Sequence, residues 1–466
     1  MVLLTPTPVP RYPTMSSLRI TIGGVRGIVG ESLTPDLIVR YSQALGTYVE
    51  GGKVLVSRDT RKSGAMVASC VLTGLIGTGC EVVDLGICPT AALQLAVRDS
   101  DASGGLAVTA GHNPEGWNAL KSVRSDGMFL NPAQASELLD TYHQGEFTKA
   151  TWDRLHPVTV DSQAKRRHID AICAQLDADA VARTGLRVAI DCANGATSRS
   201  APVLLELLGL DVVALNTEIG APFPHPPEPS AHNLAQLRAL TAAAGADVGF
   251  AFDADGDRLG VVCGDGSTPG EEATVCLAAE AVLRRGDRGP VVTNLCTTRA
   301  LDDVAARHGR EVIHTAIGQA YIAEAAANHG AAVAGEGSGG VVFPRINYAH
   351  DSLAAMGYIL ELMADSGQSL RELTEQLPVY SMAKLQIACP VASSYTALER
   401  LRARGMPEWA TAEDLQDGVK YSNQDQWVHV RVSATEPIIR VIAEARTADA
   451  ADALARGYLN EVRQLM

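Results

Sequence analysis

The chain has 466 residues, a formal net charge of -14 and 46% hydrophobic residues. This length exceeds what one hydrophobic core supports, and it predicts three or four domains. An acidic chain lacks the basic face that binds nucleic acids and anionic membranes, so neither is expected as a partner. No apolar run reaches the roughly 18 residues of a membrane-spanning helix.

Two features of the sequence predict a cytoplasmic location. Residues 1–17 begin with a proline-rich stretch without the basic start and apolar run of a signal peptide, and we expect them to be a disordered extension. The nine cysteines are scattered without a CxxC pair. This usage indicates free thiols in a reducing compartment.

Three segments repeat the same order of strand, turn, amphipathic helix and strand. The expected strands lie at 54–59 and 81–85, at 187–191 and 211–215, and at 291–294 and 311–314. Repeated βαβ units predict mixed, largely parallel sheets with helices on both faces. The predicted fold class is therefore α/β, with three homologous α/β domains.

The last segment differs from the other three. It has an alternating strand at 427–432 and a helix at 449–465, which indicate a smaller α+β domain. We place the four domains at 18–156, 157–268, 269–382 and 383–466. Four domains of this kind are expected to enclose a central cleft, to which each contributes one loop.

Three aspartates alternate directly after an apolar strand at 248–252. Asp253, Asp255 and Asp257 carry carboxylates at a spacing that can converge on one hard cation such as Mg²⁺. The alternative is a solvated acidic turn, whereas an EF-hand is excluded because its ligand spacing and closing glutamate are absent. We predict a Mg²⁺ site, with Arg258 beside it to steady a phosphoryl oxygen.

Two further loops carry groups suited to a sugar phosphate. Glu336 and Ser338, within the glycine-rich turn 335–340, can bind vicinal sugar hydroxyls, although composition alone would make this a plain turn. Near the C-terminus, guanidinium and hydroxyl groups suited to a dianionic phosphate stand within ten residues, and the alternative is an ordinary surface loop. These residues are Arg431, Ser433, Thr435 and Arg440.

The segment Thr109-Ala110-Gly111-His112-Asn113-Pro114 resembles the catalytic loop Thr-Ala-Ser-His-Asn-Pro of the α-D-phosphohexomutases, whose serine carries a transferable phosphoryl group. The segments 253–258, 335–340 and 431–440 resemble three further motifs, in family order. The family includes phosphoglucosamine mutase and phosphomannomutase. The resemblance implies Mg²⁺-dependent interconversion of the 1- and 6-phosphates of a hexose or hexosamine, with a hexose 1,6-bisphosphate as activator.

The same resemblance implies roles for single residues. Gly111 stands at the nucleophile position and offers no oxygen to phosphorylate. His112 matches a histidine beside the nucleophile, and Arg26 an arginine near the phosphoserine. Lys121 matches a lysine regarded as a general acid/base. We expect burial near arginines to lower its pKa. The alternative is that Lys121 is an exposed lysine at a helix end.

Glycine at position 111 leaves three hypotheses open. In the first, the natural protein is a phosphohexomutase and Gly111 is a variant. In the second, water or a bound bisphosphate replaces phosphoserine, giving a phosphatase or phosphotransferase. In the third, the chain is a non-catalytic sugar-phosphate-binding protein. The metal-site aspartates together with Lys121 favour an enzyme. Gly23, where the family often has serine, argues against a single substitution. The chain is expected to be a monomer or homodimer.

Overall fold

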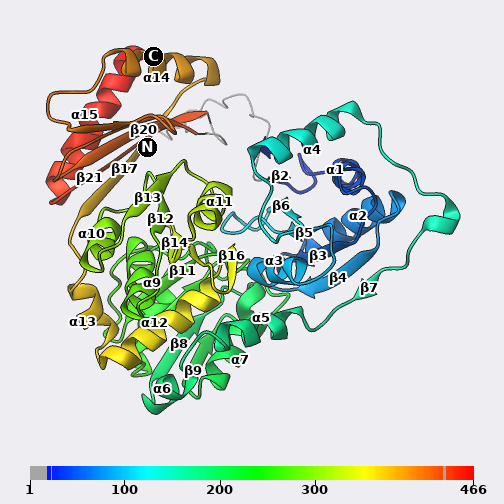
Figure 1. Ribbon diagram of the computed structural model, residues 1–466, viewed down its shortest axis with the longest axis horizontal. Coiled ribbons are helices and arrows are strands. Elements are labelled where there is room, and N and C mark those ends of the chain that lie inside the picture. The colour runs from blue at the N-terminus through cyan, green and yellow to red at the C-terminus, as the bar shows by residue number, and fades with distance from the viewer. Residues whose placement is uncertain (1–17, 22–23, 434–436) are drawn as a thin grey trace, which may run out of the picture.

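The computed structural model describes residues 18–21, 24–433 and 437–466. Within these ranges the chain forms four sheets with helices packed against them (Figure 1). This arrangement confirms the predicted class of three α/β domains followed by an α+β domain. The expectations for residues 1–17, Gly23 and Thr435 lie outside the described residues.

The first sheet has the strand order β1-β2-β6-β5-β3-β4-β7. Its β3, β5, β4 and β7 pair in parallel, while β1, β2 and β6 add antiparallel partners at the other side. The sheet extends to β7, past the boundary predicted at 156. The strands are β1 Arg19–Thr21, β2 Gly24–Ile28, β3 Val54–Arg58, β4 Val82–Ile87, β5 Gly104–Val108, β6 Trp117–Arg124 and β7 Thr159–Val160, and the helices are α1 Pro35–Tyr48, α2 Gly64–Gly77, α3 Thr90–Arg98 and α4 Pro132–Gln144.

The second sheet has the order β11-β10-β8-β9, and only β11 runs antiparallel to its neighbour. Its parallel centre, β8 and β10, is buried except at Arg187 and is rich in β-branched and aromatic residues, as is typical of parallel sheets covered on both faces. The strands are β8 Arg187–Asp191, β9 Asp211–Leu215, β10 Val248–Phe252 and β11 Leu259–Cys263, and the helices are α5 Ala164–Cys173, α6 Ala178–Arg183, α7 Ser200–Leu207 and α8 Ala235–Ala243.

The third sheet has the order β13-β12-β14-β15-β16, in which the first three strands are parallel and the last two antiparallel. The strands are β12 Val291–Asn294, β13 Val312–Thr315, β14 Val333–Gly335, β15 Val341–Phe343 and β16 Asn347–His350, and the helices are α9 Glu272–Arg284, α10 Ala300–Arg307, α11 Gln319–His329, α12 Ser352–Ser366 and α13 Leu370–Glu375.

The fourth sheet is antiparallel, with the order β17-β21-β20-β19-β18. It lies above the third domain in Figure 1, and the long amphipathic α15 packs along it. The strands are β17 Ser381–Ala388, β18 Ala412–Asp414, β19 Val419–Ser422, β20 Trp427–Val432 and β21 Ile438–Ala445, and the helices are α14 Val391–Ala403 and α15 Ala448–Leu465.

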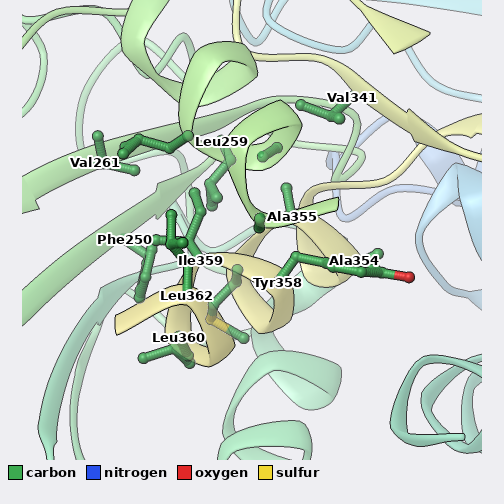
Figure 2. Close-up of a cluster of buried hydrophobic side chains, with 14 of the residues drawn as sticks. Phe250, Leu259, Val261, Val341, Ala354, Ala355, Tyr358, Ile359, Leu360 and Leu362 are labelled. Carbon is green, nitrogen blue, oxygen red and sulfur yellow. The ribbon is translucent and has the colours of Figure 1, made fainter. Parts of the chain in front are cut away.

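One hydrophobic core joins the second and third domains. Figure 2 shows Ile359 and Leu362 of α12 gathered with Phe250 and Leu259 from the second sheet, and Val341 of the third sheet belongs to the same cluster. Burial of large side chains stabilises such a core by about 1.5–3 kcal/mol each. This shared core holds the metal and sugar loops of the two domains at a common edge.

Two sequence predictions concern the chain as a whole. No helix in the described ranges is both long and apolar enough to cross a membrane. All nine cysteines are free thiols, which confirms the prediction made from their spacing.

Candidate active site

A cavity of about 680 Å³ is lined by residues from all four domains. The first domain contributes Arg26 and Lys121, and the fourth contributes Arg440. Every described residue predicted for the site lines this cavity: Arg26, Gly111, His112, Lys121, Asp253, Asp255, Asp257, Arg258, Glu336, Ser338, Arg431, Ser433 and Arg440. Residues more than 400 positions apart in the sequence, such as Arg26 and Arg440, therefore line the same cavity.

The loop that carries Gly111 joins β5 to β6 at the cavity wall. Gly111 has a φ of 54°, in the left-handed region that glycine adopts without steric cost. Its amide donates to Thr109 Oγ1 at 3.1 Å, and Thr109 Oγ1 donates to Asp59 Oδ2 at 2.7 Å. A Cβ at position 111 would lie 3.3 Å from Asp255 Oδ2. The nucleophile position therefore faces the aspartate loop.

Arg61 holds this loop in shape, and no motif in the sequence indicates this role. Its guanidinium donates to four backbone carbonyls, those of Gly111 at 2.6 Å, Asn113 at 2.7 Å, Pro114 at 2.7 Å and Trp117 at 3.1 Å. The side chain is fully buried and paired with Asp59 at 2.9 Å. The only local signal in the sequence is that Asp59 and Arg61 stand two residues apart directly after a strand.

The aspartate loop is anchored through its own carbonyls from three domains. Asp255 O accepts from Thr90 N of α3 at 3.0 Å, and Ala254 O accepts from Ala196 N at 2.8 Å. Gly256 O accepts from the amide of Ser352, the first residue of α12, at 3.1 Å. These contacts fix the loop backbone independently of what its carboxylates bind.

The three carboxylates of this loop have different partners. Asp253 Oδ1 accepts from the amides of Asp257 at 2.8 Å and Arg258 at 3.0 Å. Burial raises the pKa of Asp253 well above its ordinary value, and the charges of Asp255 and Asp257 raise it further. The loop therefore carries negative charge that the protein compensates only in part.

Lys121 supplies part of that compensation. It lies on β6 and is buried, so it is not an exposed lysine at a helix end. Its Nζ donates to Asp255 Oδ2 at 2.8 Å and to Asp257 Oδ2 at 3.1 Å. Burial alone would lower the pKa of Lys121, but the two carboxylates outweigh it and raise that pKa. The expected lowering is wrong because the charges of these two carboxylates outweigh that of Arg26.

The residues present fit a hard cation, although no three His, Cys, Asp or Glu side chains in the described ranges are already arranged as a metal-binding group. Lys121 Nζ stands between two of the carboxylates in this structure. Among the described residues, the buried atoms Asp255 Oδ1 and Asp257 Oδ1 have no hydrogen-bond partner. Buried carboxylate oxygens without donors are suitable ligands for Mg²⁺. The metal site remains a prediction.

Replacing Asp255 by asparagine should weaken Mg²⁺ binding at least tenfold, because one anionic ligand is lost while the shape of the side chain is kept. Isothermal titration calorimetry with MgCl₂ measures this. Asp170→Asn is the control, since Asp170 is an exposed residue of α5 paired with Arg166. Equal Mg²⁺ affinity in parent and Asp255→Asn would place the ion elsewhere.

The cations predicted around position 111 lie as a group on the cavity wall. Arg26 Nη1 donates to Asn113 Oδ1 at 2.6 Å, which ties β2 to the loop. Arg258 Nη1 donates to Glu228 Oε1 at 3.1 Å. Burial, followed by the charges of Arg258 and Arg26, lowers the pKa of His112 to about 2, so this imidazole is neutral. A neutral histidine among arginines can accept a hydrogen bond from a ligand.

The predicted sugar loop follows β14 and pairs with the chain leaving the aspartate loop. Leu259 N donates to Gly339 O at 3.0 Å. Ser338 Oγ donates to Glu336 Oε1 at 2.6 Å, and Asn294 Nδ2 donates to Glu336 Oε2 at 2.9 Å. Glu336 is thereby held at the cavity in a defined orientation, with its carboxylate and the Ser338 hydroxyl side by side.

The predicted phosphate loop lies on the edge of the fourth sheet that faces the cavity. Arg431 of β20 and Arg440 of β21 are direct partners in the antiparallel ladder, so their side chains share a face. Arg431 forms an ion pair with Asp417 at 3.2 Å. Two neighbouring guanidinium groups at this edge are suited to one phosphate.

Two further residues belong to this region, since Gln319 lines the cavity and His350 contacts Gln319. Gln319 at the start of α11 donates to Asp257 Oδ2 at 3.0 Å and contacts His350 Nδ1 at 2.7 Å. The His350 ring occupies the space beside Gly340, where a Cβ would lie 2.3 Å from His350 Nδ1. Neither residue belongs to a sequence motif, because each comes from a separate element of the third domain.

Family models of phosphoglucomutase/phosphomannomutase match the chain in four successive segments. The model of alpha/beta/alpha domain I matches residues 20–149, that of domain II residues 166–266, and that of domain III residues 270–380. The model of the C-terminal domain matches residues 387–459. The matches follow the four sheets in order.

Individual relatives are similar over nearly the whole chain. A phosphoglucomutase/phosphomannomutase of Thermococcus kodakarensis is 35% identical over 92% of this chain and 94% of its own length. A probable phosphoglucosamine mutase of Methanopyrus kandleri is 34% identical over 95% of this chain and 97% of its own.

Solved structures of the same family have the same fold. A phosphoglucomutase/phosphomannomutase family protein from Burkholderia thailandensis superposes with a TM-score of 0.83 at 26% identity, covering 96% of this chain and 97% of that one. A putative phosphomannomutase from Thermus thermophilus gives 0.81 at 26% identity, covering 97% and 99%.

Proposed function

Since the chain belongs to the phosphoglucomutase/phosphomannomutase family, we propose that it is a Mg²⁺-dependent enzyme that transfers phosphoryl groups between the 1- and 6-positions of hexose or hexosamine phosphates. The observation that supports this best is that residues from all four predicted loops line a single cavity. A sugar phosphate can therefore contact metal-site, sugar and phosphate groups at once.

The roles in this proposal follow the position of each group. Asp253, Asp255 and Asp257 would hold Mg²⁺, which when bound supplies Lewis-acid polarisation of a phosphoryl oxygen. At the far end of the cavity, Arg431 and Arg440 hold the phosphate that does not react.

The remaining groups position the sugar and neutralise the reacting phosphate. Glu336 and Ser338 bind sugar hydroxyls. Arg26 and Arg258, which line the wall around position 111, balance the charge of the reacting phosphate. Lys121, whose Nζ contacts two carboxylates in this structure, would act as a charged donor toward that phosphate.

Gly111 requires a phosphoryl carrier other than the protein. We assign this role to a bound hexose 1,6-bisphosphate. A hydroxyl of the sugar monophosphate attacks a phosphorus of the bisphosphate, the bond from that phosphorus to the first sugar breaks, and one proton passes from the attacking to the leaving oxygen. The products are a sugar phosphate and a new bisphosphate, so the carrier is regenerated.

Gly111 also supports a second candidate function, hydrolysis of the sugar phosphate. The side-chain atoms nearest to the missing Cβ are those of the Asp255 carboxylate, at 3.3 and 3.4 Å. A water molecule in that place can be oriented by the carboxylate for attack on phosphorus. This reaction would release inorganic phosphate, whereas the transferase would not.

One experiment separates these functions. The protein and Mg²⁺ are incubated with glucose 1-phosphate, mannose 1-phosphate or glucosamine 1-phosphate, with and without the matching 1,6-bisphosphate, and followed by ³¹P NMR. Formation of the 6-phosphate only when bisphosphate is present supports the transferase. Inorganic phosphate alone supports the phosphatase, and binding without any product supports a non-catalytic sugar-phosphate-binding protein.

Replacing Arg440 by alanine should weaken the binding of glucose 6-phosphate at least tenfold, since a charge-assisted hydrogen bond contributes about 1.5–3 kcal/mol. Calorimetric titration of parent and variant measures this. Arg456→Ala is the matched control, because Arg456 is an exposed residue of α15 in the same domain. If the parent binds glucose as tightly as glucose 6-phosphate, the phosphate-loop assignment is wrong.

A further inference from the structure

The carboxylate of Glu272 lies against the middle of the sugar loop. Glu272 is the first residue of α9, and its side chain reaches the backbone of Gly337. A Cβ at Gly337 would lie only 1.7 Å from Glu272 Oε2, so the carboxylate occupies the space that any other side chain at 337 would need. Gly337 separates Glu336 from Ser338, and all four residues line the cavity. Glu272 is thus a neighbour of the two residues proposed to hold the sugar.

The negative charge around Glu272 is only partly balanced. Lys384 Nζ of β17 lies 3.2 Å from Glu272 Oε1, but it also lies 2.5 Å from Glu271 Oε1. The amide of Thr298 donates to Glu272 Oε2 at 3.0 Å. Two carboxylates therefore share one ammonium group, and the closer of the two is Glu271, so the charge of Glu272 is only partly compensated.

Glu272 and Glu336 differ in how well their charges are stabilised. Burial raises the pKa of Glu272 to about 7, against the opposing effect of Lys384. Glu336 is also buried, but the nearby His350 and Arg258 and the donors Ser338 and Asn294 lower its pKa. Of the two, Glu272 is the carboxylate that would gain most from a positive charge on the ligand.

We propose, on the basis of the proposed function, that Glu272 binds the protonated amino group of a hexosamine phosphate and so selects amino sugars over hexoses. Glucose and mannose phosphates present only neutral hydroxyls at the ring positions where an amino sugar presents an ammonium group. A hydroxyl can donate a hydrogen bond to the Glu272 carboxylate but cannot compensate its negative charge. Selection arises from this difference in charge between the ligands.

The test compares binding of glucosamine 6-phosphate, glucose 6-phosphate and mannose 6-phosphate by calorimetry, so that it needs no turnover. The parent protein should prefer glucosamine 6-phosphate about tenfold, as expected for one hydrogen bond to a charged group. Glu272→Gln should abolish the preference and leave the affinity for glucose 6-phosphate within about twofold. Glu271→Gln is the matched control, because Glu271 pairs with the same Lys384 but is not among the residues that line the cavity.

A second variant makes the test independent of the folding of Glu272→Gln. Gly337→Ala should also lose the preference, since its Cβ would displace the Glu272 carboxylate. Equal binding of all three sugar phosphates by the parent would overturn the proposal. So would equal loss of preference in Glu271→Gln and Glu272→Gln, because Glu272 would then act only as a partner of Lys384. Failure of all three ligands to bind would overturn the proposed function itself.

Discussion

Replacing Gly111 by serine is expected to raise the interconversion of hexose 1- and 6-phosphates roughly a thousandfold or more, because it restores an oxygen where the family carries its phosphoryl group. The Cβ would lie 3.3 Å from Asp255 Oδ2, a close contact with the proposed metal ligand. Arg61 holds the loop through carbonyl groups, which do not depend on the side chain at position 111. The site should therefore accept serine with its surroundings intact.

The cost of this substitution is modest compared with the expected gain. Position 111 has a φ of 54°, which costs a non-glycine residue about 1–2 kcal/mol. Gly111→Ala is the matched control, since it introduces the same Cβ and the same backbone strain without an oxygen. The variants are primed with hexose 1,6-bisphosphate, activity is followed by ³¹P NMR, and phosphorylation of residue 111 is measured by mass spectrometry.

The alanine variant should remain unphosphorylated and gain no activity. A serine variant that folds and binds Mg²⁺ and sugar phosphate, yet is neither phosphorylated nor active, would refute the mutase interpretation of this site. Release of inorganic phosphate by the parent protein would then favour hydrolysis, and its absence would favour a binding protein.

Replacing Arg61 by methionine should destabilise the protein by about 3–5 kcal/mol, the usual effect of removing one partner from a buried ion pair. Asp59 would remain buried without its cation, and four loop carbonyls would lose their donor. Urea denaturation followed by circular dichroism measures the free energy of unfolding. The folded fraction should also bind sugar phosphate more weakly, because the loop around Gly111 is no longer held.

Arg58→Met is the control for this experiment. Arg58 ends β3, the strand that precedes Arg61, and its Nη1 donates a long hydrogen bond to Asp59 O, at 3.5 Å. We expect this variant to change stability by less than about 1 kcal/mol. Similar losses in both variants would show that Arg61 contributes no more than an ordinary arginine at this edge of the sheet.

Local patterns in the chain, together with the family resemblance, were sufficient to predict several of the elements and part of the cavity lining. The runs at 187–191, 291–294 and 427–432 coincide with β8, β12 and β20, and the helix predicted at 449–465 lies within α15. Each has a strong local signal, either β-branched residues in succession or an amphipathic repeat. The glycine at position 111 is visible because it departs from a motif whose other residues are present.

Charge balance within the cavity was not predictable in the same way. The sequence suggested a lowered pKa for Lys121 because arginines were expected nearby, but the charges of Asp255 and Asp257 outweigh that of Arg26 and raise that pKa. Distances between groups from different domains decide such shifts, and a sequence contains none of them. The same holds for Gln319, which lines the cavity, and for His350, which contacts Gln319, since neither belongs to a motif.

The sequence by itself determined the four-domain α/β architecture, the order of the loops and the absence of a hydroxyl at position 111, since each depends on residue identity and local periodicity. Only the tertiary structure decided that Arg61 shapes the loop around Gly111 and that Glu272 lies against Gly337. Both contacts join residues about 50 or more positions apart, and neither Arg61 nor Glu272 belongs to a motif identified in the sequence. They arise because the packing of sheets and helices places a buried charged side chain against the backbone of a distant loop. Burial makes the energy of such a charge depend on the groups that pair with it.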